Sequence, residues 1–244
     1  MATVKTTAKA KRVNTKKLTA ERARMAAIAE RLKEIYPDAV CALEWGGQYG
    51  GERDALLCDS WKLLVMGRLS AQCTDARVNI VCRELFARFP TVVSMAEADV
   101  TDIEAIVRPC GLYRTKAQNI KDACHILVEE HGGIVPNDMD ALLALPGVGR
   151  KIANLLLGDI YKQGGVVTDT HCIRICGRLG FYAEDVKDPL KVERMLTPLI
   201  AREEQSDFCH RIVQFGRDTC TARAPACAAC PLAELCPHGG KKKA

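Results

Sequence analysis

The sequence predicts an all-α protein, and three observations lead to this fold class. Apolar residues recur every three or four positions along several segments of helical length, nearly every such segment ends at Pro, Gly or a polar cluster, and no set of segments alternates apolar and polar residues as strands do. A chain of 244 residues, 48% hydrophobic and 27% charged, can bury one sizeable core or two small ones. We therefore expect a globular helical protein with short connections.

The first helix is expected to start at Thr19, whose side chain can accept a hydrogen bond as the N-cap, and to end before Pro37. Its apolar positions are Met25, Ile28, Leu32 and Ile35. A loop should follow over residues 44–52, because four of these nine residues are glycines.

The next helix is expected to begin at Asp59 or Ser60, either of which can cap it, and to run through Leu69. Further segments with helical periodicity lie near residues 77–89, 101–107, 116–130 and 137–145. No long repeat is present, so the chain is not expected to be a solenoid.

Charge is unevenly distributed along the chain. The net charge is +5, but residues 1–24 carry +7 and Lys241, Lys242 and Lys243 add +3, which leaves −5 for the segment between them. A tail of Lys, Ala and Thr buries little apolar surface, so we expect residues 1–18 and 241–244 to be flexible basic tails. A polyanion is one partner that such tails suit, and a solubilising role explains the composition equally well.

Other features of composition exclude some classes of protein. No apolar run is long enough to span a bilayer, and the first thirty residues lack the pattern of a secretory signal. Thirteen cysteines, an odd number, indicate thiols and metal ligands in a reducing compartment. Aromatic residues make up only 5%, which argues against binding single strands by base stacking.

A helix–hairpin–helix pattern surrounds Gly147-Val148-Gly149. Asn137 can cap a helix that stops at Leu145, because Pro146 cannot continue it, and a second helix starts at Arg150. The glycines permit a tight turn, and the N–H groups at the start of the second helix can bind a DNA phosphate without regard to sequence. A generic corner between helices is an equally good interpretation of this run taken alone.

Lys151 lies in the first turn of this second helix. The positive end of the helix dipole disfavours an ammonium group there and so favours a nucleophilic amine. Most lysines are solvated surface charges, so Lys151 alone does not establish catalysis. Asp169 likewise fits two roles: it can cap the helix that follows Thr168, or it can face a cleft and accept a proton or stabilise a cation.

Four cysteines near the C-terminus follow the spacing C-x6-C-x2-C-x5-C, at Cys220, Cys227, Cys230 and Cys236. Zinc sites usually present two close pairs separated by a longer arm, whereas one short winding segment suits the corners of a 4Fe-4S cluster. The spacing favours iron–sulfur over zinc, and zinc over four unrelated thiols. The other nine cysteines are expected to be small core residues.

Together these motifs resemble those of the endonuclease III family, helix-hairpin-helix DNA glycosylases with a C-terminal 4Fe-4S cluster. The resemblance rests on LPGVGRK, on Asp169 eighteen residues after Lys151, and on the cysteine spacing, and it runs from about Glu21 to Cys236. It implies a helical barrel domain at residues 54–162 with the helix-hairpin-helix, and a cluster domain at residues 163–240. The first helix and loop, residues 19–53, should pack with the cluster domain, and DNA should cross the cleft between the domains.

The resemblance also implies roles for individual residues. Lys151 should attack C1′ of a damaged nucleotide with help from Asp169. The family's SAQ-x-T-D motif appears as Ser70-Ala71-Gln72-Cys73-Thr74-Asp75, and its Gly-Leu-Tyr turn as Gly111-Leu112-Tyr113. By resemblance, the DNA-binding residues are Gln72, Leu112, Gly147, Val148, Gly149 and Arg150. Gln72 would fill the gap left by the flipped base, and Leu112 would wedge the opposite strand. The substrate-pocket candidates are Ser70, Asp75, Tyr113 and His171, although His171 can equally be a core histidine.

The function implied is that of a bifunctional DNA glycosylase and abasic-site (AP) lyase, which removes oxidised pyrimidines from duplex DNA and cleaves the strand by β-elimination. We expect a monomer without membrane partners, acting inside a bacterial cell at the nucleoid. One alternative is a monofunctional mismatch or uracil glycosylase of the same superfamily, although Lys151 and the chain end eight residues after Cys236 disfavour the adenine-mismatch enzyme. The other alternative is a non-catalytic DNA-binding module.

The chain departs from the family pattern in three places. Only Arg223 is charged in residues 221–226, where relatives often carry several basic residues, so phosphate binding there should be weaker. Leu143 stands where some members have Glu, which alters hydrogen bonding near the hairpin. The loop around Gly47 is longer than usual, and DNA contact by this loop stays open.

Overall fold

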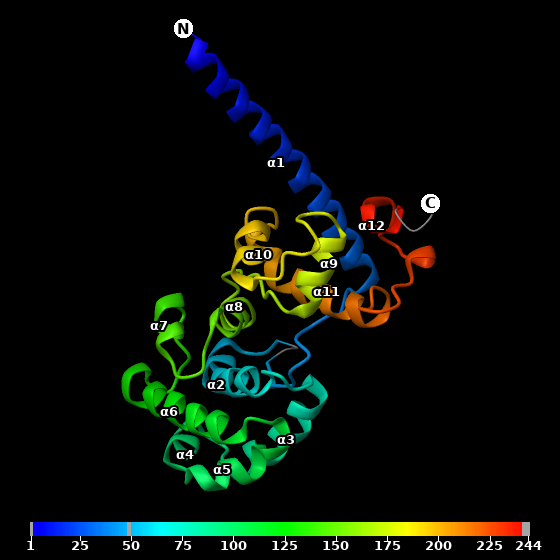
Figure 1. The fold of residues 1–244 in the computed structure, drawn as a ribbon. Coiled ribbons are helices and arrows are strands. Elements are labelled where there is room, and N and C mark those ends of the chain that lie inside the picture. Colours follow the sequence, from blue (N-terminus) through cyan, green and yellow to red (C-terminus); the bar gives the residue numbers. More distant parts are fainter. Residues whose placement is uncertain (1, 48–49, 241–244) are drawn as a thin grey trace. The chain divides into compact units, whose positions relative to one another are not determined.

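The computed structural model describes residues 2–47 and 50–240, with side chains over residues 16–47 and 50–239. These residues form helices and connecting turns, with no strand among them, so the predicted all-α class is confirmed (Figure 1). The chain divides into two compact units. Unit 1 comprises Met1–Ala39 and Val166–Ala244, and unit 2 comprises Val40–Gly165, which includes the loop that follows the first helix.

Unit 2 holds seven α-helices and one short 3-10 helix over its described residues. They are α2 (Arg53–Leu69), α3 (Asp75–Arg88), α4 (Val92–Glu97), α5 (Val100–Val107), η1 (Arg108–Cys110), α6 (Tyr113–His131), α7 (Met139–Ala144) and α8 (Arg150–Asp159). Trp61 of α2 is 1% exposed and meets Phe86 of α3 edge to face, with ring centroids 5.3 Å apart. Such aromatic pairs add packing energy to the buried area.

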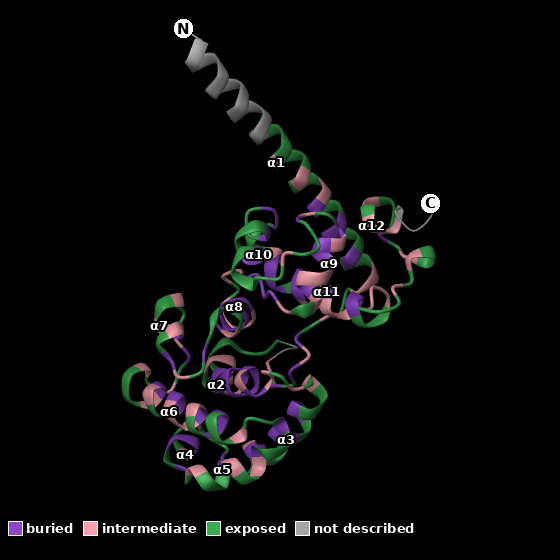
Figure 2. Cartoon of the chain, viewed as in Figure 1, coloured by how far each residue is buried: buried purple, intermediate pink, exposed green. Residues whose placement is uncertain are grey.

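Unit 1 joins the N-terminal helix to the last third of the chain. Its elements are α1 (Ala2–Ile35), α9 (Thr170–Arg178), α10 (Pro189–Leu196), η2 (Arg202–Glu204), α11 (Gln205–Asp218), η3 (Cys227–Ala229), η4 (Ala233–Leu235) and α12 (Pro237–Gly240). Helix α1 packs against α11. The buried stripe of α1, coloured purple in Figure 2, contains Met25, Ile28 and Leu32, all fully buried as the apolar spacing predicts.

Arg24 fastens α1 to the C-terminal part of unit 1. Its Nη1 donates to the carbonyl oxygens of Leu179, at 2.5 Å, and of Leu235, at 3.3 Å. Its guanidinium carbon lies 4.2 Å from the centroid of the Phe181 ring, which is cation–π geometry. One side chain therefore joins α1, the C-cap of α9 and the last residue of η4, which directly precedes Cys236.

Three predicted helix starts are wrong. Helix α1 begins at Ala2 instead of Thr19: ten of the seventeen residues from Ala2 to Leu18 are Ala, Lys, Arg or Leu, which favour a helix. Helix α2 begins at Arg53, with Glu52 at its N-cap, so Asp59 and Ser60 lie inside the helix. Helix α7 is capped by Asp138 instead of Asn137: its Oδ1 accepts from the backbone nitrogens of Asp140 and Ala141 at 3.0 and 2.9 Å.

Several smaller expectations have mixed outcomes. Seven of the nine cysteines outside the cluster motif are buried as expected, but Cys58 is exposed and Cys73 is only partly buried. In the Gly-rich loop, Gly47 lies against Trp45, which is 2% exposed, while Tyr49 lies outside the described residues. The basic residues 241–243 lie outside them as well. None of the described helices is both long and apolar enough to cross a membrane.

We predict that Arg24→Ala lowers the free energy of unfolding by about 1–3 kcal/mol, because it leaves the carbonyls of Leu179 and Leu235 without this donor. Thermal denaturation measures the change. The matched control is Arg31→Ala on the same helix, which removes only an exposed pair with Glu34 and should cost less than about 0.5 kcal/mol. Equal losses for the two variants would contradict the anchoring role of Arg24.

Candidate functional site

The hairpin between α7 and α8 has the predicted tight turn. Val148 donates its backbone N–H to the Leu145 carbonyl at 3.1 Å, and Gly147 adopts a positive φ of 76°. A Cβ on Gly147 would come within 2.5 Å of Arg68 Nε and 2.9 Å of Asn119 Oδ1. Glycine is therefore needed here both for its backbone conformation and for the close approach of its neighbours.

The hairpin rests on a polar pair from two other helices. Arg68, at the end of α2, donates from Nε and Nη2 to Asn119 Oδ1 of α6, at 3.1 and 2.9 Å. Burial lowers the pKa of Arg68 from its usual value. Because Gly147 sits directly on this pair, α2 and α6 together fix the position of the turn.

Lys151 is the second residue of α8 and is exposed. The N-cap of α8 is Gly149, which supplies no side-chain cap for the first N–H groups of the helix, so these donors are suited to an anion. The next residue, Ile152, packs on α2, where a Cβ on Gly67 would lie 3.3 Å from it. The lysine thus projects from a helix end that is packed firmly on α2.

The two expected wedge residues share an unusual backbone conformation. Gln72 has φ 56° and Leu112 has φ 50°, and they are two of only three residues other than glycine with positive φ in the described chain. Both side chains are exposed, and Leu112 is 59% exposed although it is a large apolar residue. Left-handed backbone at such residues costs free energy and is concentrated at functional sites.

Lys116 lies beneath both of these residues and was not among the candidates from sequence. Its side chain is fully buried, and Nζ donates to the carbonyl oxygens of Leu69, Ala71 and Cys110 at 2.8, 2.7 and 2.8 Å. Burial lowers the pKa of this lysine, while nearby Cys110 and Cys73 act in the opposite direction.

The other candidates in unit 2 surround the same two turns. The hydroxyl of Ser70 donates to the Gly67 carbonyl at 2.8 Å and so caps the end of α2. Asp75 is the first residue of α3 and is half-buried. The ring of Tyr113 has the guanidinium groups of Arg108 and Arg114 at 5.7 and 5.4 Å from its centroid. Two positive charges therefore accompany Tyr113, next to Leu112, which suits a surface that meets phosphates.

Asp169 and His171 belong to unit 1. Asp169 is the N-cap of α9, and its Oδ1 accepts from the Cys172 backbone N–H at 2.7 Å; its side chain remains half-exposed. His171 Nδ1 lies 3.2 Å from Arg174 Nη2, and a Cβ on Gly216 would come within 2.3 Å of it. These contacts favour a packing role for His171, so its role in the substrate pocket stays a prediction.

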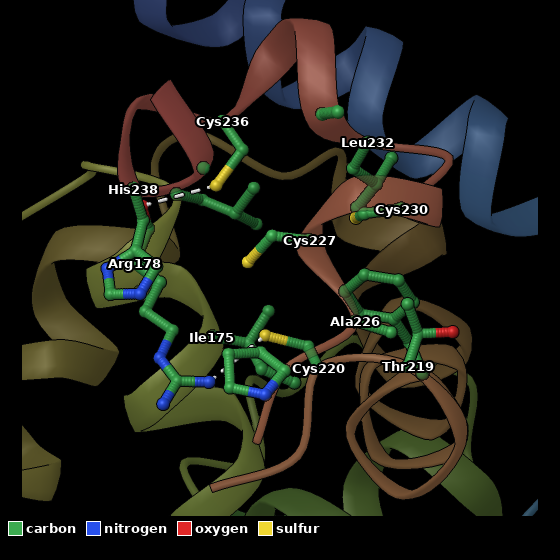
Figure 3. A pocket seen from close by; sticks show the side chains of 15 residues that line it. Ile175, Arg178, Thr219, Cys220, Ala226, Cys227, Cys230, Leu232, Cys236 and His238 are labelled. Atoms are coloured by element: carbon green, nitrogen blue, oxygen red, sulfur yellow. Dashed lines mark hydrogen bonds between the residues drawn. The ribbon is translucent and has the colours of Figure 1, made fainter. Parts of the chain in front are cut away.

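The four cysteines of the C-terminal motif line one cavity within unit 1 (Figure 3). Cys220 follows α11, Cys227 begins η3, and Cys230 and Cys236 directly follow η3 and η4. Arg178 of α9 donates to Cys220 Sγ at 3.4 Å and to the carbonyls of Thr221 and Ala222 at 2.7 and 2.8 Å. In Figure 3 the sulfurs of Cys220, Cys227 and Cys236 point toward a common space.

This donor set fits a cluster better than a single metal ion. A tetrahedral zinc with Zn–S bonds of about 2.3 Å would need sulfurs about 3.8 Å apart. Within the described part of the chain, no three of the four sulfurs lie within 4.8 Å of one another, which leaves room for a larger group. Burial and the other three cysteines raise the pKa of Cys230, so four thiolates are stable together only beside compensating positive charge.

Comparisons with known proteins agree with these features. Residues 65–202 match the model of the HhH-GPD superfamily base excision DNA repair proteins, and residues 220–236 match the iron-sulfur binding domain of endonuclease III. The second match runs from the first to the last of the four cysteines. The endonuclease III of Synechocystis sp. is 40% identical over 223 residues, which cover 91% of this chain and 95% of that protein.

Solved structures give the same result for the fold. A non-covalent endonuclease III–DNA complex and a trapped endonuclease III–DNA covalent intermediate each align with a TM-score of 0.78 at 36% identity. Each alignment covers 91% of this chain, and 98% and 99% of the respective solved chains. The predicted family and 4Fe-4S cofactor are thereby confirmed. The chain belongs to the endonuclease III family of base excision DNA repair enzymes.

Proposed function

We propose that this protein is a bifunctional DNA glycosylase and AP lyase in which Lys151 is the nucleophile. Its substrates would be duplexes that contain damaged bases, oxidised pyrimidines in particular, or abasic sites. The observation that carries the proposal is the exposed amine of Lys151 in the first turn after the hairpin. A relative of this chain has been trapped as a covalent intermediate with DNA, which requires a nucleophilic side chain.

DNA binding would use the hairpin and the two wedge residues of unit 2. The first N–H groups of α8, which follow the turn of Gly147, Val148 and Gly149 and begin at Arg150, suit a backbone phosphate, which fixes register without reading sequence. A glycosidic bond inside the base stack is out of reach, so the damaged nucleotide must be flipped out. Gln72 and Leu112, both exposed, would fill the gap and wedge the facing strand.

The chemistry follows from one amine and one carboxylate. The neutral Nζ of Lys151 attacks C1′, the base leaves, and the sugar opens to a Schiff base with the lysine. This imine acidifies the C2′ proton, whose removal expels the 3′ phosphate and cleaves the strand. Asp169, hydrogen-bonded at the start of α9, would stabilise positive charge on the sugar or accept a proton from the amine.

The cluster ligands would be Cys220, Cys227, Cys230 and Cys236. A bound 4Fe-4S cluster would link these four thiolates through Fe–S bonds and offset part of their negative charge. This link would fix the segment from Thr219 to His238, which is short of regular structure over its described residues. Fixed in this way, the segment would give unit 1 a docking surface for DNA.

The proposal also covers the oligomeric state, the place of action and the domain bounds. Catalysis by a monomer at the nucleoid of a bacterial cell fits the bacterial sources of the relatives and the polyanionic substrate. Residues 54–162 and 163–240 would be the barrel and cluster domains. A monofunctional glycosylase would not form the lysine adduct, and a non-catalytic module would not release a base, so both alternatives are open to the experiments below.

We predict that Lys151→Ala abolishes the covalent adduct formed with an abasic-site duplex in the presence of borohydride, and lowers lyase activity on the order of 10³-fold or more. The matched control is Arg150→Ala in the same turn, which removes a charge but not the nucleophile. It should weaken duplex binding and still form the adduct. If the Lys151 variant still formed the adduct, the nucleophile would be another residue. If the wild-type protein formed no adduct, the proposed lyase activity would be contradicted.

A second pair of variants separates the two roles of Asp169. Asn caps helices as well as Asp does, so Asp169→Asn should leave the melting temperature unchanged while lowering base release about 10²–10⁴-fold. Asp169→Ala should show the same catalytic loss and in addition lose about 1 kcal/mol of stability. Full activity in the Asn variant would show that Asp169 is only a cap.

The left-handed conformation of Leu112 predicts that two substitutions weaken DNA binding equally but differ in their effect on stability. Leu112→Gly and Leu112→Ala both remove the wedge and should weaken binding to an abasic-site duplex about tenfold. Glycine adopts φ 50° without strain, so the Gly variant should unfold with a free energy about 0.5–1 kcal/mol higher than the Ala variant. Chemical denaturation and duplex titration measure the two effects. Equal stability of the two variants would show that no strain is held at this position.

A further inference from the structure

We propose that Lys116 is a positioning residue that holds Gln72 and Leu112 together in the conformations with which they enter DNA. This inference rests on the proposed function, because it takes these two residues to be the wedges. Lys116 is exposed to neither solvent nor substrate, so its effect on DNA would act through the two turns that it joins.

Each N–H donor of the Lys116 ammonium group has a backbone carbonyl oxygen as its acceptor. A lysine has three N–H donors, and Nζ of Lys116 has three acceptors at 2.8, 2.7 and 2.8 Å. Leu69 is the last residue of α2, and helix ends leave carbonyls without partners inside the helix. A positive charge at this C-terminal end is also favoured by the helix dipole. These contacts explain how the charge is held in the interior without a carboxylate bonded to it.

The three acceptors lie at two different turns, the one that contains Gln72 and the one that contains Leu112. Ala71 comes directly before Gln72, and Leu69 directly precedes the turn in which the Cys73 N–H bonds to the Ser70 carbonyl. On the other turn, Cys110 comes two residues before Leu112. The backbone N–H of Lys116 also donates to the Leu112 carbonyl at 3.0 Å, so one residue binds the second turn on both sides of Gly111.

The backbone conformations of the wedges need such support. Residues other than glycine adopt positive φ only when the surrounding structure imposes it. Gln72 and Leu112 lie in short turns, and their own side chains are exposed. Fixing the carbonyls next to them restricts their φ and ψ.

The consequence is that the two wedges act as a unit. If the ammonium group is removed, three carbonyls, those of Leu69 and Cys110 in buried hydrogen bonds, lose their donor, and both turns are expected to relax at once. The protein should then lose its preference for a duplex with a gap in the base stack, while phosphate binding at the hairpin, which rests on Arg68 and Asn119, persists.

The test compares affinities of the full cluster-loaded protein for two duplexes, one undamaged and one with a tetrahydrofuran abasic-site analogue. The variants are Lys116→Met, Gln72→Ala, Leu112→Ala and their combinations. We expect Lys116→Met to reduce the preference for the analogue at least tenfold and to leave affinity for undamaged duplex within about twofold. Added to the Gln72→Ala/Leu112→Ala double variant, it should cause no further loss of preference.

The control for a general loss of stability is Ser60→Ala, which removes another fully buried donor of unit 2, inside α2 and nine residues before its end at Leu69. It should lower the melting temperature and keep the preference for the analogue. If Lys116→Met does not fold, Lys116→Gln, which keeps two of the three donors, is used and should show a smaller loss of the same kind.

Each outcome bears on a different claim. A wild-type preference in the folded Lys116 variant, beside losses in Gln72→Ala and Leu112→Ala, would overturn this inference and leave the proposed function intact. Wild-type preference in both wedge variants would overturn the wedge roles and this inference with them. An equal loss in Ser60→Ala, or full additivity of Lys116→Met with the wedge variants, would show that the lysine acts only on stability or at another place.

Discussion

The structure of unit 2 depends on a short run of polar contacts between the end of α2 and the start of α6. Arg68 and Asn119 form one pair, and Gly147 of the hairpin lies directly on it. One turn earlier on α6, Lys116 joins the end of α2 to the turn before Leu112. Consecutive residues of α2 and neighbouring residues of α6 therefore support all three segments proposed to contact DNA.

This arrangement explains why a helical protein can place chemistry at its surface with rigid geometry. Helix starts supply the two groups proposed for catalysis: Lys151 projects from the first turn of α8, and Asp169 caps α9 in the other unit. Close helix packing at Gly67 fixes α8, and Arg178 and Arg24 tie the cysteine segment to helices of unit 1. Exposed side chains thus stand on a backbone that is held by buried contacts.

Sequence reasoning predicted the parts of the molecule that depend on local pattern. Apolar spacing identified the buried face of α1, and glycines and Pro146 located the hairpin. It missed Lys116, because its three acceptors come from residues 6 to 47 positions away and no local rule brings them together. One signal was available: Lys116 stands four residues before Ile120, in register with the apolar stripe of α6. The left-handed backbone of Gln72 and Leu112 could not be read from residue type, since tertiary contacts impose it.

The central claim is that one rigid helical unit carries both the nucleophile and the wedges. A crystal structure of the protein reduced onto an abasic-site duplex with borohydride tests this most directly. The account predicts a bond from Lys151 Nζ to the sugar C1′ carbon, Gln72 and Leu112 inside the duplex, and the ammonium of Lys116 still bound to its three carbonyls. A bond to another amine, or wedge residues outside the base stack, would contradict it.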